Sequence, residues 1–220
     1  MFLALHFYTW ISSLKLTKVY ISTTLVCIHP LITTLLSSII LKESLKPSAI
    51  LGILITILGS STVSCSATSN NNGDVDVYGA LLALIGAFLA SAYILAGRYV
   101  RVRASKLGSY VIPTYATSSL TLFLITLIEC NSVIAIDLSD VPWMVVLALG
   151  PMMGGHTLLN YMLRYVNASI ASVPIVLEPV GASIPASLIL LENMTQVSCL
   201  GMILTVVGLI MITLTPSNNK

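Results

Sequence analysis

The chain has 220 residues, of which 56% are hydrophobic and 8% are charged, and its formal net charge is +2. A soluble domain carries about 25% charged residues, so this supply cannot cover a surface that faces water. The composition excludes an ordinary soluble protein and indicates an all-α integral membrane protein in a lipid bilayer. The small net charge gives no argument for a nucleic-acid partner.

Seven stretches are long and apolar enough to cross a bilayer, which takes roughly 20 residues. In chain order they are Val19–Leu41, Ser48–Ala67, Val77–Gly97, Ser109–Glu129, Val141–Leu163, Val166–Leu190 and Thr195–Thr215. An apolar segment at Met1–Leu14 precedes them, but as a helix it reaches only about 21 Å. The sequence therefore predicts a bundle of about 7–8 transmembrane helices.

Basic residues concentrate in alternate predicted loops. The loop after Gly97 alone holds Arg98, Arg101, Arg103 and Lys106. If this loop is cytoplasmic, the even loops and the tail hold eight Lys and Arg residues, and the odd loops hold two. The positive-inside rule then predicts a multi-pass protein of the cell membrane whose C-terminus is cytoplasmic.

The sequence contains an internal repeat, because a shift of 149 residues aligns 6–66 with 155–215. The matched residues include Pro30 and Pro179, Gly52 and Gly201, Thr56 and Thr205, and Gly59 and Gly208. The repeat spacing contains five predicted helices, an odd number, so matched loops face opposite sides of the membrane. Inverted repeats of this kind recur in secondary transporters.

Longer motifs in both copies connect this repeat to a known family. The first copy contains ALHFYTWISSLKLTKVYISTTLVCIHPL (4–31), LKES (41–44) and LGILITILG (51–59). The second copy contains SAYILAGRYVR (91–101), LEPVGASIPASLILLEN (177–193) and LGMILTVVG (200–208). In this order, and with the inversion, they resemble the EamA-type repeats of the drug/metabolite transporter superfamily over nearly the whole chain.

The resemblance implies an organisation into two inverted repeats, the first of them truncated. That superfamily has ten helices in two five-helix repeats. Residues 1–67 would be the last three helices of the first repeat, the first of them partial, and 77–215 a complete second repeat. A polar external linker, 68–76, would join them. The missing helices would reflect a fragment, a misplaced start codon or a degenerate copy.

The resemblance also implies a function: transport of amino-acid-like metabolites or drugs by alternating access, with proton-coupled export as one form. No Lys or Arg lies deep in a predicted span, which favours neutral, zwitterionic or cationic solutes over phosphates. The chain has no H-E-x-x-H or G-x-S-x-G motif and no metal-type cysteine spacing, so we expect no enzyme activity, cofactor or metal. The alternative is a non-transporting fragment that needs a partner chain to complete the bundle. The sequence leaves open whether the protein forms a homodimer.

The candidate site centres on Glu178, near the middle of its predicted span. A charge at a helix centre costs about 2.5–3.5 kcal/mol, so it normally faces a cavity or a partner. Pro174, Gly181 and Pro185 share its helix face by their spacing, and Pro179 follows it directly. Because prolines loosen the backbone ladder, we expect a broken helix that lines the bundle interior. Glu178 then binds a proton or a cation, or else bonds the broken helix structurally.

His29 occupies the position of Glu178 in the other copy and precedes Pro30 in the same way. With an ordinary pKa of about 6.5, a histidine can titrate at physiological pH. The further candidates for a solute or proton site are His156, Asn160, Trp10, His6 and Tyr93. For His29 and each of these residues the alternative is packing or hydrogen bonding within the core.

The charge pattern predicts that Asn71 and Arg103 lie on opposite sides of the membrane. Single cysteines introduced by Asn71→Cys and Arg103→Cys, after replacement of the native cysteines, should react with an impermeant maleimide from opposite faces of oriented vesicles. Labelling of both positions from one face would contradict the topology and the inversion with it.

Overall fold

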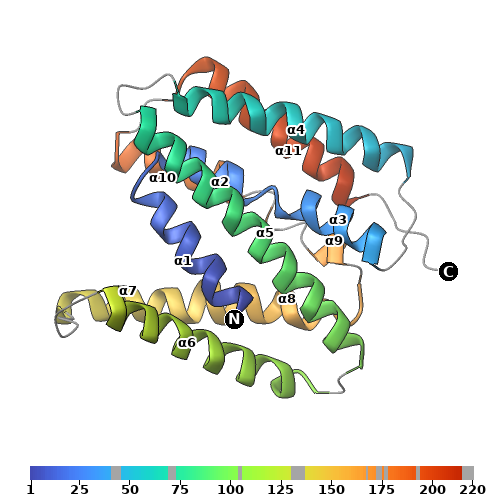
Figure 1. The fold of residues 1–220 in the computed structure, drawn as a ribbon, viewed down its shortest axis with the longest axis vertical. Coiled ribbons are helices and arrows are strands. Elements are labelled where there is room, and N and C mark those ends of the chain that lie inside the picture. Colours follow the sequence, from blue (N-terminus) through green and yellow to red (C-terminus); the bar gives the residue numbers. More distant parts are fainter. Residues whose placement is uncertain are drawn as a thin grey trace.

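The structure is a computed structural model that describes residues 1–40, 46–68, 73–103, 106–129, 137–166, 168–171, 175, 178–191 and 194–214. The regular elements in these ranges are all helical (Figure 1). They are α1 (Phe2–Leu14), α2 (Val19–Val26), α3 (His29–Ile40), α4 (Pro47–Thr68), α5 (Gly73–Arg103), α6 (Gly108–Glu129), η1 (Leu138–Asp140), α7 (Val141–Leu147), η2 (Ala148–His156), α8 (Thr157–Met162), α9 (Ala168–Ala171), α10 (Glu178–Ile189) and α11 (Gln196–Thr213).

Among the described residues, five helical stretches are long and apolar enough to cross a membrane. They are Val19–Ile40, Val77–Arg103, Gly108–Glu129, Leu138–Met162 and Gln196–Thr213. Shorter apolar helices occupy Phe2–Leu14 and Pro47–Val63. The predicted all-α membrane class is confirmed, and the described helices lie within or close to the predicted spans.

The helices form a layered bundle with α5 near its middle. Figure 1 shows α4 and α11 side by side along one edge, with α2 and α5 next to them and α1 packed against α5. The opposite edge holds α6 and the continuous run of α7, η2 and α8 (Figure 1). The Tyr115 hydroxyl on α6 lies 3.0 Å from that of Thr157, the first residue of α8. These layers surround the candidate site, which lies between α1, α8 and the spans that contain His29 and Glu178.

The contact between α4 and α11 joins equivalent helices of the two sequence repeats. A Cβ added to Gly52 would lie 2.8 Å from the carbonyl oxygen of Gly208, and one added to Gly201 would lie 2.9 Å from that of Gly59. The two helices therefore run antiparallel, at a distance that only residues without side chains permit. A pair of equivalent helices packed in this way is what an inverted repeat requires.

Two predicted spans are broken at equivalent places. The first, predicted as Val19–Leu41, is interrupted at Cys27 and Ile28, and α3 restarts at His29. The second, predicted as Val166–Leu190, contains α9 and α10 as separate helices, and α10 begins at Glu178; of the residues between them the structure describes Ile175 alone. In both half-helices a proline is the second residue, where its missing N–H leaves no helical bond unmade. The repeat thus places His29 and Glu178 at the N-termini of matching half-helices.

The predicted span Val141–Leu163 contains a π-helical segment, η2, from Ala148 to His156. This segment includes Pro151, which cannot donate a backbone hydrogen bond. π-helical turns are rare and widen a helix locally, and those that occur are frequently found at functional sites. His156 is the last residue of η2, so the wide turn determines where its ring lies.

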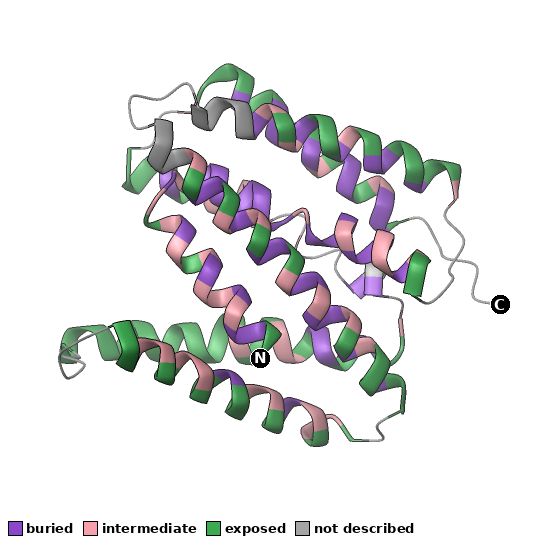
Figure 2. Ribbon diagram, in the orientation of Figure 1, coloured by how far each residue is buried: buried purple, intermediate pink, exposed green. Residues whose placement is uncertain are grey.

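The outer faces of the bundle are apolar. Figure 2 shows that α6 and the stretch from Leu138 to Leu149 are mostly exposed, and the exposed side chains include Phe123, Trp143 and Leu147. In water such a surface would be unstable, whereas hydrocarbon solvates it well. The exposure pattern therefore fits a bundle whose outer surface faces lipid.

Two predicted loops contain more helix than expected. Arg98, Arg101 and Arg103 lie on α5 rather than in a loop. Helices α4 and α5 extend into the predicted linker 68–76 from both ends, and residues 69–72 lie outside the described residues. The backbone in both places continues its hydrogen-bonded ladder past the apolar run, because charged residues end a membrane span but do not end a helix.

The α4–α11 contact predicts that Gly208→Ala destabilises the fold. The new Cβ would lie 2.6 Å from both the Gly52 carbonyl oxygen and the Thr56 nitrogen, so the helices must separate. We expect a loss of about 1–3 kcal/mol, seen as a lower thermal unfolding midpoint in detergent. Gly181→Ala is the control, since a Cβ there meets nothing within 4 Å. Equal midpoints for both variants would contradict the close contact.

Candidate functional site

A cavity of about 310 Å³ lies between the broken spans and the helices around them. Its size is at the lower end of the range for small-molecule sites. The side chains that line it come from α1, α2, α3, η2, α8, α9 and α10, and from Ile175. They are His6, Phe7, Trp10, Val26, Cys27, His29, Pro151, Gly155, His156, Leu158, Leu159, Met162, Ala171, Ile175 and Glu178.

Five of the seven predicted site residues line this cavity: His6, Trp10, His29, His156 and Glu178. The sequence has three histidines in all, and each of them contributes to the wall. Within the described residues the wall carries one carboxylate and no Lys or Arg. A set of titratable groups that is scattered over 173 positions in the chain is thus gathered into one place.

One part of the wall is built from the two helix breaks. Glu178 begins α10, and the Cys27 thiol at the end of α2 donates a hydrogen bond to its Oε2 across 3.5 Å. At a helix N-terminus the backbone dipole stabilises the negative charge of a carboxylate. His29 begins α3, and its carbonyl oxygen accepts a hydrogen bond of 2.9 Å from the Ser91 hydroxyl on α5. α5 thereby holds one break in position.

Another part of the wall is aromatic. The His6 and Trp10 rings on α1 stack with centroids 5.9 Å apart, at an angle of 16°. The Phe7 ring packs edge-on against His156 at 5.2 Å. Together these rings from α1 and η2 form a surface on which a flat or cationic group can stack.

Several polar atoms of the wall have no hydrogen-bond partner in the part of the chain that the structure describes. They are Nε1 of Trp10, Nδ1 of His29 and Nδ1 of His156. His6 differs, because its Nδ1 lies 2.9 Å from the Gly86 carbonyl oxygen. A carbonyl only accepts, so this nitrogen carries the proton and the neutral ring keeps Nε2 as an acceptor. Buried polar atoms are normally paired, so the wall is suited to a solute with polar groups.

Tyr93 and Asn160, the other two predicted site residues, lie behind the wall rather than in it. The Asn160 amide donates a 2.5 Å hydrogen bond to the Tyr93 hydroxyl, and both side chains are buried. The Tyr93 ring lies 6.2 Å from that of His156. This pair therefore supports His156 from the side of α5, at one remove from the cavity.

The predicted proline and glycine hinges have different surroundings. Pro30 and Pro179 are buried beside the breaks. Gly181 and Pro185 are exposed and do not line the cavity, so the predicted shared interior face was wrong beyond Glu178. α10 turns Pro179, Ser183 and Ala186 inward instead. Pro174 lies outside the described residues.

Sequence reasoning missed two wall residues that contact its candidates. Cys27 is not among the predicted site residues, yet its thiol bonds to Glu178. Phe7 was not considered, although it neighbours His6 and packs on His156. The adjacency of Cys27 to the break before Pro30 is a local signal that could have identified the first. Nothing local distinguishes Phe7 from an aromatic residue that faces lipid.

The donor set of the wall does not form a metal site. Of the described residues, no group of three or more His, Cys, Asp or Glu side chains is arranged to hold a metal ion.

The fold and site define a class: a multi-pass membrane protein with a largely apolar cavity inside the bundle, whose wall carries three histidines and one carboxylate. The model of the EamA-like transporter family matches residues 1–65 and 77–214, so the chain belongs to this family, as its repeats predicted. A solved crystal structure of a protein superposes with a TM-score of 0.65 and 20% identity, over 96% of this chain and 74% of that one. This likeness shows the fold alone. No curated protein matches the sequence significantly.

The hydrogen bond behind the wall predicts that Tyr93→Phe destabilises the protein. The change leaves the buried Asn160 amide without its partner, at a cost of about 1–3 kcal/mol. Thermal unfolding in detergent should show a lower midpoint than for Tyr99→Phe, a control at an exposed tyrosine of the same helix. Equal midpoints would mean that the bond to Asn160 contributes nothing.

Proposed function

We propose that this membrane transporter moves small neutral, zwitterionic or cationic organic solutes across the cell membrane by alternating access. Amino-acid-like metabolites and drugs are examples of such solutes. The observation that carries the proposal is that every histidine of the sequence and Glu178 line one cavity between two broken spans. Ionisable groups gathered inside a membrane bundle are typical of a solute or proton pathway.

The chemistry of the wall supports this solute class. A carboxylate at one side and stacked rings at another suit a cationic or dipolar solute with a flat apolar part. An anion such as a phosphate would meet Glu178 with no Lys or Arg among the described wall residues to offset the repulsion. The three wall nitrogens that have no partner among the described residues supply hydrogen bonds to a neutral solute.

Proton coupling follows from the same carboxylate. Glu178 binds either a proton or a cationic group, because one negative charge neutralises only one of them in a poorly hydrated cavity. A solute that leaves toward one side is then replaced by a proton from that side, and the exchange drives export. His29, at the matching break, is the second proton acceptor of this scheme.

Alternating access needs helices that change shape at the cavity. The turn at Cys27–Ile28 separates α3 from α2, and α10 is a separate helix that begins at Glu178, so α3 and α10 are suited to tilting against their neighbours. Discontinuous helices of this kind serve the binding sites of many secondary transporters. The C-terminus lies on the cytoplasmic side in this scheme, as the charge distribution expects.

The proposal predicts that Glu178→Gln abolishes proton-driven flux while the protein still inserts and folds. The amide keeps the shape of the side chain but cannot exchange a proton or balance a cation. Flux is measured in proteoliposomes with an imposed pH gradient, using ethidium as an organic cation and radiolabelled glutamine as a neutral amino acid.

Glu129→Gln is the matched control, because Glu129 lies outside the wall and accepts a hydrogen bond from Tyr8. It should leave the flux unchanged. Proton-driven flux that survives Glu178→Gln at the wild-type rate would make Glu178 a structural residue and end the coupling scheme.

A further inference from the structure

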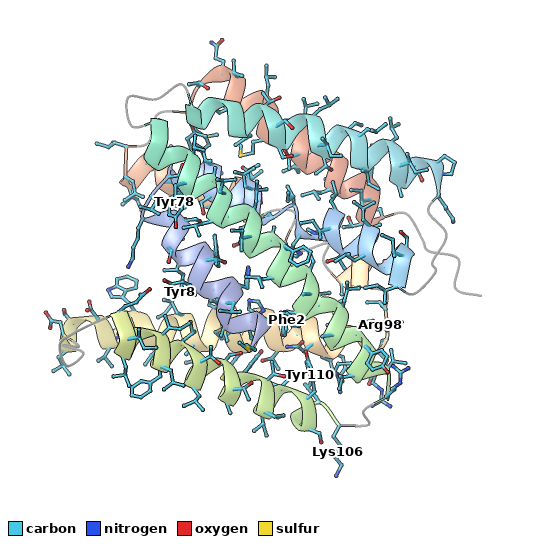
Figure 3. All side chains as sticks on the ribbon, viewed as in Figure 1. Phe2, Tyr8, Tyr78, Arg98, Lys106 and Tyr110 are labelled. Carbon is cyan, nitrogen blue, oxygen red and sulfur yellow. The ribbon has the colours of Figure 1, made fainter. Side chains whose placement is uncertain are left out.

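Two arginines of α5 bind the C-terminal end of α8, next to the cavity. Nε of Arg101 donates a hydrogen bond of 2.9 Å to the carbonyl oxygen of Asn160, and Arg98 donates one of 2.6 Å to that of Leu163. Figure 3 labels Arg98 near the C-terminal end of α5. We call these two side chains and the two carbonyls the arginine clamp.

The clamp satisfies groups that the helix itself leaves open. The N–H groups that follow α8 bond elsewhere: those of Leu163 and Arg164 go to the carbonyls of Leu159 and Tyr161. The Asn160 carbonyl is thus free to accept from Arg101. A helix C-terminus carries partial negative charge, which favours a cation at this place.

Arg101 is buried to an extent that a topology anchor does not need. Its side chain is 1% exposed, whereas Arg103 on the same helix is exposed and packs over the Tyr99 ring at 3.7 Å. Burial of a guanidinium is costly unless its charge and hydrogen bonds are compensated. One terminal nitrogen of Arg101 has no partner within the described ranges, so the compensation in this conformation is incomplete.

The clamp lies beside the cavity wall. Leu158, Leu159 and Met162 of α8 line the cavity, and the clamped carbonyls of Asn160 and Leu163 belong to the same turns. Buried side chains fill the space between α5 and α8 here, namely Tyr93, Ile94, Leu159 and Leu163. α5 and α8 are thus packed together beside the cavity wall.

We propose that the arginine clamp is the gate on the arginine side of the cavity, the side that the charge distribution places in the cytoplasm. Opening breaks both hydrogen bonds, separates α8 from α5 and lets water hydrate the buried guanidinium of Arg101. This inference rests on the proposed alternating access.

Cys27 is a built-in reporter of the gate, because it lines the cavity and is buried. In a background where the other cysteines, Cys65, Cys130 and Cys199, are replaced by serine, an impermeant maleimide is applied to either face of oriented proteoliposomes. Arg101→Gln should raise the rate of Cys27 labelling from the arginine side by about tenfold or more, since a hydrogen bond to a charged group stabilises the closed state by at least that ratio. Arg103→Gln is the matched control and should change nothing.

An unchanged rate in Arg101→Gln, or an equal rise in Arg103→Gln, overturns the gate. If Arg101→Gln fails to fold, Arg98→Lys and Arg101→Lys keep the charge but lose the guanidinium geometry, and they should raise the labelling rate in the same direction. Unchanged labelling in both lysine variants overturns the gate as well. The assay needs neither solute nor proton gradient, so its result is separate from the flux test of Glu178.

Discussion

The structure depends on one constraint: a polar group inside hydrocarbon must find a partner within the protein. Helical ladders meet this need along most of the chain, and the breaks in two spans create the exceptions. At one break the Ser91 hydroxyl bonds the His29 carbonyl, and at the other the Cys27 thiol bonds Glu178. The polar side chains therefore collect where the backbone is interrupted, and the cavity lies between these places.

Close helix contact is the second requirement, because a cavity in the middle must be held open by a rigid surround. The antiparallel glycine contact between α4 and α11 supplies part of it. Small residues of α5 supply another part, since Ala83, Ala87 and Ser91 are fully buried. Without a hydrophobic drive between helices in lipid, such close packing contributes much of their association. The apolar outer faces of α6 and α7 are left to the bilayer.

The proposed function depends on polar atoms that have no hydrogen-bond partner among the described residues. Trp10, His29 and His156 each present in the cavity wall a nitrogen without a partner in the described part of the chain, and a solute can bond to it. Arg101 likewise has, among the described residues, a terminal nitrogen without a partner near the end of α8, where water would hydrate it in an open state. In the proposed transport cycle these atoms exchange one set of hydrogen-bond partners for another. In no state are all of them paired.

The sequence by itself determined the membrane class, the helix positions, the repeat and the family, because apolar length and charge spacing are local properties of the chain. It also singled out His29 and Glu178, since an ionisable residue before a proline is costly in any membrane helix. Only the tertiary structure decided that Phe7 and Cys27 complete the wall, that Tyr93 and Asn160 stand behind it, and that Arg101 is buried. These outcomes depend on contacts between distant segments, and the one-dimensional pattern of a helix does not reveal which neighbour each face meets.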